Sequence, residues 1–451
     1  MPIHNVVTPQ PDSIFVSIAS YRDPELIPTL RDMIAHAANP AALHIAICCQ
    51  HDSDVSPFID FGMKLLHTEK IESYDVSFFE YRDARISVIS LHYYESKGAC
   101  WARHMAERLY RNEAWFLQID SHCRFAPDWD REAIAMLLEL QADGTSPVLS
   151  TYPPAYDPED ESKRTQFISR LVFREFSADG IPMLSSTPLK SDKPARCGYL
   201  AGGFIFAPGS FVRDVPNDPD IFFAGEEIAM AARAFTHGYD IYTPNKILLW
   251  HYYQRSDASK IWSDHTNDAK KTGSVDLAWW ERDKISKKRV RSVLGIDASP
   301  CDLGCYGHGN IRTLADFEQR LGVHFLSQTV IPDVIGRERV SYFPGESFSK
   351  EMWFTQRVHP NKRKITFTID EIMADIDNDG WWHIGVYSEN NTLLEKKTFT
   401  PQEMAQRFSD KKNVYEIELT FTTPPSLKPA VVRVCSYTQR QGWGKTVEKM
   451  W

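Results

Sequence analysis

Residues 14–23 have the sequence IFVSIASYRD, an apolar run followed by four polar residues. Such a run, rich in β-branched and aromatic side chains, is typical of a strand buried on both faces of a parallel sheet. Apolar residues then recur at helical spacing between Leu26 and Ala37, and residues 43–49, LHIAICC, form a second strand-like run. A strand, a helix and a second strand in this order predict a βαβ unit.

The alternation of strands and helices continues along the chain. Residues 86–91 and 115–119 have the composition of strands, and residues 98–111 between them have apolar residues at helical spacing. This order predicts an α/β domain with a Rossmann-like, mainly parallel sheet and right-handed crossovers. Ligands of such sheets bind at the carboxyl ends of the strands, so we expect residues 20–23 to lie near those that follow Ile119.

After about residue 335 the chain becomes rich in short strand-like runs separated by turns. A length of 451 residues predicts two or three folding units. We expect an α/β domain over residues 1–335 and a small β-rich, sandwich-like accessory domain over residues 336–451. The strand-like runs are residues 365–369, 383–387, 415–421 and 431–435.

Three further segments are notable. Residues 155–194, rich in Asp, Ser, Lys and Pro, predict a long loop that acts as a lid or faces an acceptor. Residues 375–380, DIDNDG, resemble the start of an EF-hand loop, but Val386 stands where the bidentate Glu belongs, which favours a surface turn. Trp381, Trp382 and Trp443 favour core packing over a sugar-stacking platform.

Composition excludes several classes of protein. A net charge of −9 argues against nucleic acid as the main partner. The basic run of residues 284–291 favours a solvated helix face over peripheral contact with an anionic membrane or a phosphate. Residues 1–5 do not resemble the start of a signal peptide, and no later run approaches the roughly 20 apolar residues of a membrane span, so we expect a cytoplasmic protein. The eight cysteines are scattered and predict free thiols, and Cys301 and Cys305 lack the second pair that a zinc site needs.

Residues 118–122, QIDSH, give the clearest indication of chemistry. Positions two apart in an extended chain project to the same side, so Asp120 and His122 could share one divalent cation. Oxygen and nitrogen ligands suit Mn²⁺, or alternatively Mg²⁺, bridging a diphosphate. The alternative is that Asp120 caps the helix expected from Asp128 onward and that His122 is incidental.

Two further motifs predict contacts with a sugar. Gly202 and Gly203 begin a strand, where a missing Cβ lets the backbone approach a ligand closely, although a bulge is the simpler interpretation. Glu226 and Glu227 open a helix and either bind hydroxyls or stabilise charge at an anomeric carbon, or else only favour the helix dipole. His251 ends another strand-like run and is a potential metal ligand, although a lone His in this position is more often structural.

Together these motifs resemble the family of UDP-GlcNAc-dependent polypeptide N-acetylglucosaminyltransferases that modify hydroxyproline on the Skp1 protein. The resemblance spans roughly residues 12–325. Several of its elements are also similar to the polypeptide GalNAc-transferases, which have a GT-A fold, although no lectin-like domain is visible at the C-terminal end. The ordered motifs are residues 14–23, 98–103, 120–122, 201–203, 225–227, 250–255, 305–309 and 312–314.

The resemblance implies a role for each matched residue. Asp120, His122 and His251 would hold the divalent metal, and Glu226 or Glu227 would face the donor sugar as the catalytic carboxylates. It also implies transfer with retention of anomeric configuration, in which a phosphate oxygen of the donor deprotonates the acceptor hydroxyl, so no protein base is obligatory. Contacts with the nucleotide-sugar are expected from Ser20, Tyr21, Arg22, Asp23, Arg103, Asp120, Gly202, Gly203 and Arg255.

The leading hypothesis is therefore transfer of N-acetylglucosamine from UDP-GlcNAc to a hydroxyl of a protein hydroxyproline or of a glycan. Two other classes remain open at this point. Asp and His clusters also serve metal-dependent phosphoester hydrolases and nucleotidyltransferases. A non-catalytic carbohydrate-binding protein would bind the UDP-sugar without releasing UDP.

Overall fold

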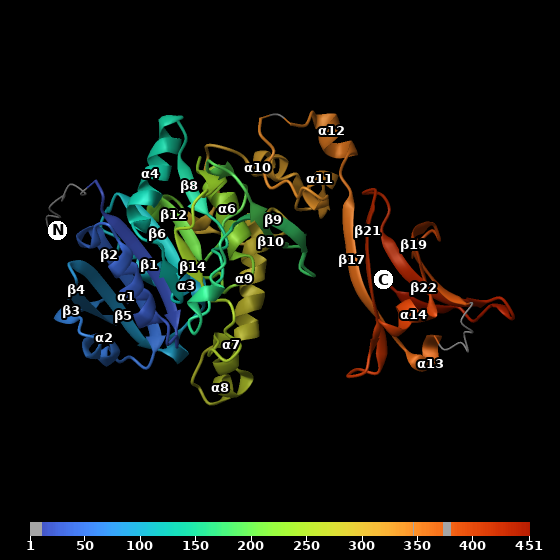
Figure 1. Cartoon of the computed structure of the whole chain (residues 1–451), viewed down its shortest axis with the longest axis horizontal. Coiled ribbons are helices and arrows are strands. Elements are labelled where there is room, and N and C mark those ends of the chain that lie inside the picture. The colour runs from blue at the N-terminus through green and yellow to red at the C-terminus, as the bar shows by residue number, and fades with distance from the viewer. Residues whose placement is uncertain (1–10, 346, 373–379) are drawn as a thin grey trace. The chain divides into compact units, whose positions relative to one another are not determined.

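The computed structural model describes residues 11–345, 347–372 and 380–451. The chain divides into two compact units, which Figure 1 shows coloured along the sequence. The first contains Met1–Leu326 and Arg339–Gly345, and the second contains Ser327–Glu338 and Glu346–Trp451. The boundary predicted after residue 335 falls within Ser327–Glu338 and stays a prediction. Residues 1–5 and most of the EF-hand-like segment, residues 375–379, lie outside the described residues.

The first unit is built on one large mixed sheet with the strand order β11-β13-β8-β12-β6-β1-β2-β5-β4-β3. Strands β6, β1, β2 and β5 run parallel to one another, as predicted, and antiparallel strands flank them. The predicted α/β class is confirmed. The strands are β1 Ile14–Tyr21, β2 Leu43–His51, β3 Lys64–Ile71, β4 Tyr74–Tyr81, β5 Ala84–His92, β6 Trp115–Asp120, β8 Pro147–Ser150, β11 Ala195–Arg196, β12 Phe204–Pro208 and β13 Asp240–Thr243.

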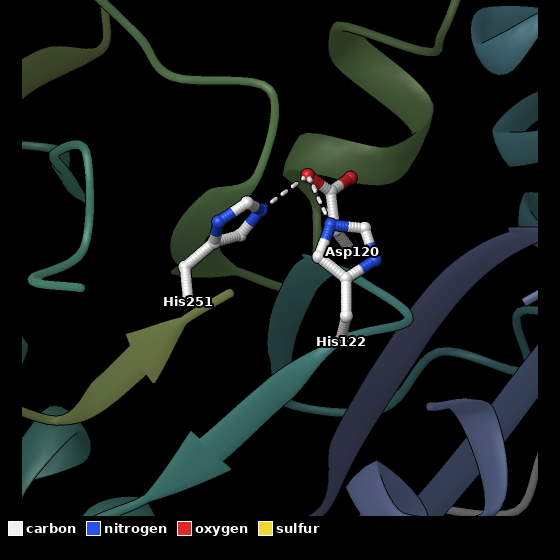
Figure 2. Close-up of side chains that lie close together, drawn as sticks. All are labelled: Asp120, His122 and His251. Atoms are coloured by element: carbon white, nitrogen blue, oxygen red, sulfur yellow. Dashed lines mark hydrogen bonds and ion pairs between the residues drawn. The ribbon is translucent and has the colours of Figure 1, made fainter. Parts of the chain in front are cut away.

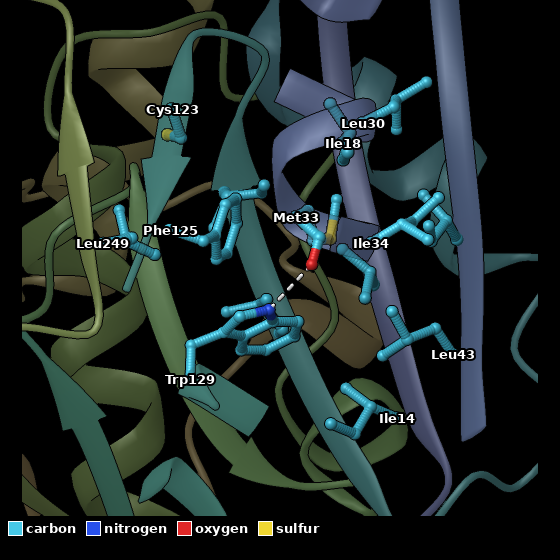
Figure 3. Close-up of a cluster of buried hydrophobic side chains, with 14 of the residues drawn as sticks. Ile14, Ile18, Leu30, Met33, Ile34, Leu43, Cys123, Phe125, Trp129 and Leu249 are labelled. Atoms are coloured by element: carbon cyan, nitrogen blue, oxygen red, sulfur yellow. Dashed lines mark hydrogen bonds between the residues drawn. The ribbon is translucent and has the colours of Figure 1, made fainter. Parts of the chain in front are cut away.

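The helices of this unit include those predicted over residues 26–37, over residues 98–111 and from Asp128 onward. Helix α1 buries the stripe that its spacing predicted, ending in Met33 and Ile34. Figure 3 shows this stripe packed against the sheet, where the indole nitrogen of Trp129 donates a hydrogen bond to the carbonyl of Met33 at 3.0 Å. The helices are α1 Leu26–His36, α2 Ser56–Asp60, α3 Ala99–Glu107, α4 Trp129–Ala142, α5 Phe211–Asp214, α6 Glu226–Thr236, α7 Ile261–Asp264, α8 Asn267–Lys271, α9 Trp279–Val293 and α10 Leu314–Leu321.

Two hairpins of this unit were not predicted from the sequence. The long loop predicted over residues 155–194 is wrong over much of its length, because β9 (Ile168–Phe176) and β10 (Pro182–Leu189) form an antiparallel hairpin there. The consecutive residues Leu171, Val172 and Phe173 of β9 are buried, and charged residues flank them on both sides. The turn between β4 and β5 consists of Arg82 and Asp83, whose φ angles of 46° and 68° suit a two-residue hairpin without the usual Gly or Asn.

The position of His251 depends on the pairing of two short strands. Strand β7 (Cys123–Phe125) follows β6 directly, and β14 (Leu249–His251) pairs with it antiparallel. In this register His251 lies opposite Cys123, which is the residue that follows the Asp120 to His122 motif. The pairing therefore joins two sequence motifs that lie far apart along the chain.

The second unit contains the predicted β-sandwich. Its described strands form one sheet of β17, β21 and β20 and another of β19, β18, β22, β23 and β24. Both sheets contribute side chains to a common core, among them Phe367, Leu419, Ile384 and Val432. The elements are α11 Pro332–Ile335, α12 Lys350–Thr355, β17 His359–Thr368, α13 Ile369–Ile372, β18 Trp381–Ser388, β19 Leu393–Phe399, α14 Pro401–Ala405, β20 Phe408–Ser409, β21 Val414–Thr423, β22 Pro429–Thr438, β23 Gly442–Trp443 and β24 Val447–Met450.

The three tryptophans of this unit separate between the two faces of one sheet. Trp382 packs in the core, as predicted. For Trp381 and Trp443 the prediction of core packing is wrong, since successive strand residues face opposite sides and both rings contact Tyr437 on the outer face. The Trp443 side chain is 59% exposed.

Several predictions from composition can be compared with the structure. All eight cysteines lie in the described residues and are free thiols. The basic run of residues 284–291 lies on α9, where Lys287 is paired with Asp179 and Asp283, which agrees with a solvated helix face. No helix among the described residues is both long and apolar enough to cross a bilayer.

Candidate active site

A cavity of about 380 Å³ opens at the carboxyl ends of β1 and β6 in the first unit. In the parallel register Ala19 lies beside Asp120, so both strand ends reach the cavity. Most of the predicted site residues converge on it, whereas Ser20, Arg22 and Gly202 are not among its lining residues. Those that line it are Tyr21, Asp23, Arg103, Asp120, His122, Gly203, Glu226, Glu227, His251 and Arg255.

Asp120, His122 and His251 form one cluster, which Figure 2 shows with both imidazole rings beside the carboxylate. The Nε2 atom of His251 lies 3.1 Å from Oδ2 of Asp120, and Nε2 of His122 lies 4.0 Å from the same oxygen. One ligand atom from each residue lies within 4.8 Å of the others. Because α4 begins at Trp129 after Asp128, Asp120 does not cap that helix, and this alternative is excluded.

The charges in the cluster suit a cation. Burial by itself would raise the pKa of Asp120, but the hydrogen bond from His251 and the charge of Arg103 outweigh it and hold the pKa well below its ordinary value. Burial lowers the pKa of His251, although its contact with Asp120 opposes this. A carboxylate beside two imidazoles is a ligand set for a divalent metal, so the donor set fits the predicted ion.

Asp23 contacts the cluster through His122, and its side chain is buried. Its Oδ2 lies 2.7 Å from Nδ1 of His122, accepts a hydrogen bond from the Ser121 hydroxyl at 2.5 Å and lies 3.0 Å from Nη2 of Arg255. Burial would raise the pKa of Asp23, but the hydrogen bond with His122 and the charge of Arg255 lower it. With Nδ1 engaged in this way, Nε2 is the ring nitrogen of His122 that is left to face Asp120.

Arg103 connects the carboxylate of Asp120 to Glu226 on α6. Its Nη2 lies 3.1 Å from Oδ1 of Asp120 and its Nη1 lies 2.9 Å from Oε1 of Glu226. Cys100, which lies on α3 with Arg103, donates through its thiol to Oε2 of Glu226 at 2.8 Å. A Cβ at Gly202 would lie only 2.3 Å from Oε1 of Glu226, so the close packing here requires glycine.

Glu227 has a different environment from its neighbour. Its Oε1 accepts a hydrogen bond from the backbone nitrogen of Gly202 at 3.0 Å, and its Oε2 accepts one from the Tyr152 hydroxyl at 2.7 Å. Burial raises the pKa of Glu227 to about 7, while the hydrogen bond from Tyr152 opposes the shift. Glu226 and Glu227 thus each form specific polar contacts, in addition to any favourable interaction with the helix dipole.

Three residues predicted to bind the nucleotide make other contacts. Ser20 is buried, and its carbonyl accepts a hydrogen bond from the side chain of Gln50 at 3.2 Å. Tyr21 and Arg22 both contact Asp264, which lies at the end of α7. Of the three, only Tyr21 also lines the cavity.

The sequence analysis missed several cavity residues, because no motif connects them. Tyr152, Phe222, Phe223 and Trp262 reach the cavity from separate segments of the chain. Phe222 packs closely against Gly98, where a Cβ would lie 2.6 Å from the carbonyl oxygen of Phe222, and this contact is visible only in the structure.

A buried hydrogen-bond chain behind the glycine pair was also missed. Asn217 donates from its side-chain nitrogen to Oε1 of Glu107 at 2.6 Å and to Oε1 of Gln118 at 2.8 Å. Gln118 in turn donates to the carbonyl of Gly202 at 2.7 Å. These contacts fix the backbone that supports Glu227.

Comparisons with known proteins were made for sequence and for structure. Residues 13–327 match the family model Glycosyltransferase (GlcNAc). A search of curated proteins found no match.

Similar solved structures include a crystal structure of GalNAc-T7 with UDP, GalNAc and Mn²⁺, at 14% identity and a TM-score of 0.40, covering 68% of this chain and 54% of that one. Another is the mannosyltransferase PcManGT from Pyrobaculum calidifontis in complex with GDP-Man and Mn²⁺, at 13% identity and a TM-score of 0.35, covering 55% and 61% of the two chains. A third is S. aureus TarS, at 12% identity and a TM-score of 0.35, covering 97% and 77%. The present chain thus spans about half the length of the GalNAc-T7 chain.

The family model covers well over half of the chain, including β1, the Asp120 to His251 cluster and both carboxylates of α6. The predicted Skp1-modifying family is a finer assignment that this match does not reach. The chain belongs to the GlcNAc glycosyltransferase family.

Proposed function

We propose that the protein transfers N-acetylglucosamine from UDP-GlcNAc to a hydroxyl acceptor, with retention of anomeric configuration, at the cavity that contains Asp120, His122 and His251. The observation that carries the proposal is the approach of three ligand atoms to within 4.8 Å of one another in this cavity. The family description, which names GlcNAc, supports the sugar. Family membership also favours a transferase over the hydrolase, nucleotidyltransferase and non-catalytic interpretations.

The metal would be held by Oδ2 of Asp120 and by the Nε2 atoms of His122 and His251. When bound, Mn²⁺ or Mg²⁺ would neutralise negative charge on the departing diphosphate. Arg255 donates to Nε2 of His122 at 3.0 Å, the same atom that the metal would need. Its guanidinium thus already brings positive charge to this point, and it can keep its contact with Asp23 when it releases His122.

The chain's own residues position the rest of the donor. Arg103 fixes the orientation of Asp120 and Glu226 by bridging them. Gly203 leaves room beside the cluster, since a Cβ there would lie 2.9 Å from Oδ2 of Asp120. Glu226 and Glu227 line the cavity and are proposed to face the sugar. Arg255 would interact with the diphosphate.

The acceptor is proposed to be a hydroxyl of hydroxyproline in a protein, as the motif resemblance implies, or of a glycan. No protein group is assigned as its base, because an oxygen of the donor phosphate can accept the proton during retaining transfer. A cytoplasmic location remains a prediction from sequence.

The test is UDP release from a panel of UDP-sugars, measured with Mn²⁺, with Mg²⁺ and with a chelator. We expect the fastest release from UDP-GlcNAc with a metal present, and a loss of at least about 10²-fold in Asp120→Ala and His122→Ala, because both remove a proposed ligand. His51→Ala is the matched control, since His51 is exposed and pairs only with Asp52. Release that survives both ligand substitutions would contradict the proposed metal site.

The stereochemistry and the acceptor are tested separately. The anomeric configuration of the product, determined by nuclear magnetic resonance, distinguishes retention from inversion. Transfer to hydroxyproline peptides is then compared with transfer to oligosaccharides. An inverted product would overturn the retaining assignment without affecting the assignment of the donor.

A further inference from the structure

Tyr21, at the end of β1, and Arg22, in the turn that follows, contact the far end of a segment that forms one wall of the cavity. The Tyr21 hydroxyl donates to Oδ2 of Asp264 at 2.8 Å. The Nη1 atom of Arg22 lies 3.0 Å from Oδ1 and 2.9 Å from Oδ2 of the same carboxylate. Arg22 has a φ of 48°, in the left-handed region, and its guanidinium lies over the Tyr93 ring at 4.4 Å. Asp264 is therefore held by two side chains from β1 and the turn that follows it.

The other end of the same segment contacts Asp23, the residue that follows Arg22 in that turn. Arg255 contacts Asp23 at 3.0 Å. Residues 256–263 lie between the two anchors, so the stretch from Tyr21 to Asp23 holds both ends of the segment. An additional contact lies just beyond Asp264, where Nε2 of the buried His265 is 3.0 Å from the Tyr93 carbonyl oxygen.

The segment, whose last residues Ile261–Asp264 form α7, contributes side chains to the cavity, and Nζ of Lys260 lies over the Trp262 ring at 5.7 Å. Ser259, Lys260, Ile261 and Trp262 all line the cavity. The Trp262 ring makes an edge-on contact with Phe223 at 6.0 Å, and the two side chains are 41% and 53% exposed. Within the described residues, the side chains of Ser259 and Lys260 form no hydrogen bond to protein. The contacts of Tyr21, Arg22 and Asp23 at the two ends of this wall tie it to β1 and to the turn that follows β1.

We propose that Asp264 is a positioning residue for donor binding, which holds residues 259–262 against the cavity so that Lys260 and Trp262 contact the nucleotide diphosphate. This inference rests on the proposed function of the cavity. Lys260 supplies a positive charge that complements a diphosphate. A wall that is ordered before the donor arrives lowers the entropy cost of binding, and this cost returns when the anchor is lost.

The inference gives the residues after β1 a role different from the one predicted. Tyr21 and Arg22 act on the nucleotide through Asp264 and the wall. Asp264 lies outside the Asp120 cluster, so its loss is expected to change donor affinity much more than the chemical step.

The primary test is the dissociation constant of UDP, measured calorimetrically with Mn²⁺ on the full chain. We expect Asp264→Asn, which keeps the shape but loses the ion pair with Arg22, to weaken UDP binding by about tenfold. Asp268→Asn on α8 is the matched control, because that carboxylate is exposed and pairs only with Lys271. In steady-state assays, KM for the UDP-sugar should rise by a similar factor while kcat stays within about twofold.

A local readout distinguishes loosening of the wall from general destabilisation. Trypsin cleavage after Lys260, mapped by mass spectrometry, should become faster in Asp264→Asn than in the native chain, and UDP should protect the native chain more strongly. Cleavage elsewhere and the melting temperature should match Asp268→Asn. Faster cleavage throughout the chain would show a structural role only and would overturn the inference.

Tyr21→Phe keeps the test open if Asp264→Asn folds poorly, since it removes a single hydroxyl. The double variant Tyr21→Phe/Asp264→Asn should lose less affinity than the two single losses combined, because both act on one contact. If the native chain binds UDP and both single variants bind it equally well, only this inference fails. If the native chain does not bind UDP, the proposed function fails as well.

Discussion

Nδ1 of His122 lies 2.7 Å from Oδ2 of Asp23, although the two residues belong to different strand ends of the sheet. This contact fixes the imidazole so that Nε2 faces Asp120 and His251. A carboxylate that orients a ligating histidine in this way normally strengthens metal binding.

Asp23→Asn should therefore weaken metal binding while leaving all three proposed ligands in place. We expect the metal concentration needed for half-maximal UDP release to rise by about 10- to 100-fold. The measurement is a Mn²⁺ titration of UDP release at saturating donor. Asp60→Asn, an exposed residue at the end of α2, is the control, and an unchanged Mn²⁺ requirement in Asp23→Asn would exclude this orienting role.

Gly202→Ala should disrupt the site through steric contact. The added Cβ would lie 2.3 Å from Oε1 of Glu226 and 3.1 Å from Nη1 of Arg103. A carboxylate end can often move, but this one is held by Arg103 and by the Cys100 thiol. We expect kcat/KM to fall by about 10²-fold, as small misplacements near reacting groups commonly cause.

The control for this substitution is Gly307→Ala. A Cβ at Gly307 would have its nearest neighbour at 3.6 Å, an ordinary contact. If both glycine variants retain the native kcat/KM, close packing at Gly202 is not needed for activity.

Arg103→Ala should lower stability as well as activity. The Arg103 side chain is buried and bridges two carboxylates, so its removal leaves Asp120 and Glu226 without their cation. Breaking a buried pair of this kind costs about 3–5 kcal/mol in the free energy of unfolding. Urea unfolding measures the change, and Arg131→Ala, which removes an exposed arginine from α4, should remain close to the native chain.

Glu107 should make stability depend on pH. Burial raises the pKa of Glu107 from 4.5 to about 7, although its hydrogen bonds with Asn217 oppose the shift. At about pH 6 the folded protein keeps this proton and the unfolded chain has lost it, so the folded state binds more protons. The contribution of Glu107 to stability therefore falls as the pH rises from about 4.5 through about 7.

Glu107→Gln removes this titration. The unfolding free energy of the native chain minus that of the variant should therefore fall as the pH rises. Urea unfolding at about pH 5, 6, 7 and 8 measures it, with Glu159→Gln at an exposed position as the control. A difference that stays constant across this range would show that Glu107 does not titrate there.

The clearest success of the sequence analysis concerns Asp120 and His122. Their spacing and their place after an apolar strand predicted that they would share one side, and in the structure both belong to one cluster. The third member, His251, was noted from the sequence as a potential ligand at the end of a strand-like run, but its assignment to the same metal came from the resemblance to known families. Its position depends on the pairing of β14 with β7, which places it opposite Cys123, and no local pattern encodes that partner.

Residues 20–23 illustrate the limit of the same reasoning. Their place after β1 predicted that they lie at the ligand-binding edge, and Tyr21 and Asp23 do line the cavity. Their hydrogen-bond partners could not be predicted, since Arg22 and Asp264 are 242 positions apart. The prediction that they contact the nucleotide directly remains untested.

Sequence patterns were enough to predict the strand and helix periodicities, the α/β class of the first unit, the β-rich second unit and the approximate edge at which polar residues gather. These follow from local side-chain spacing, which decides which face of each element avoids water. The polar contacts between distant residues could be seen only in the folded chain: Arg103 with Asp120 and Glu226, Asp23 with His122, and Asp264 with Tyr21 and Arg22. Electrostatic and hydrogen-bond energies depend on distances of a few ångströms and on burial, and the packing of distant segments sets both.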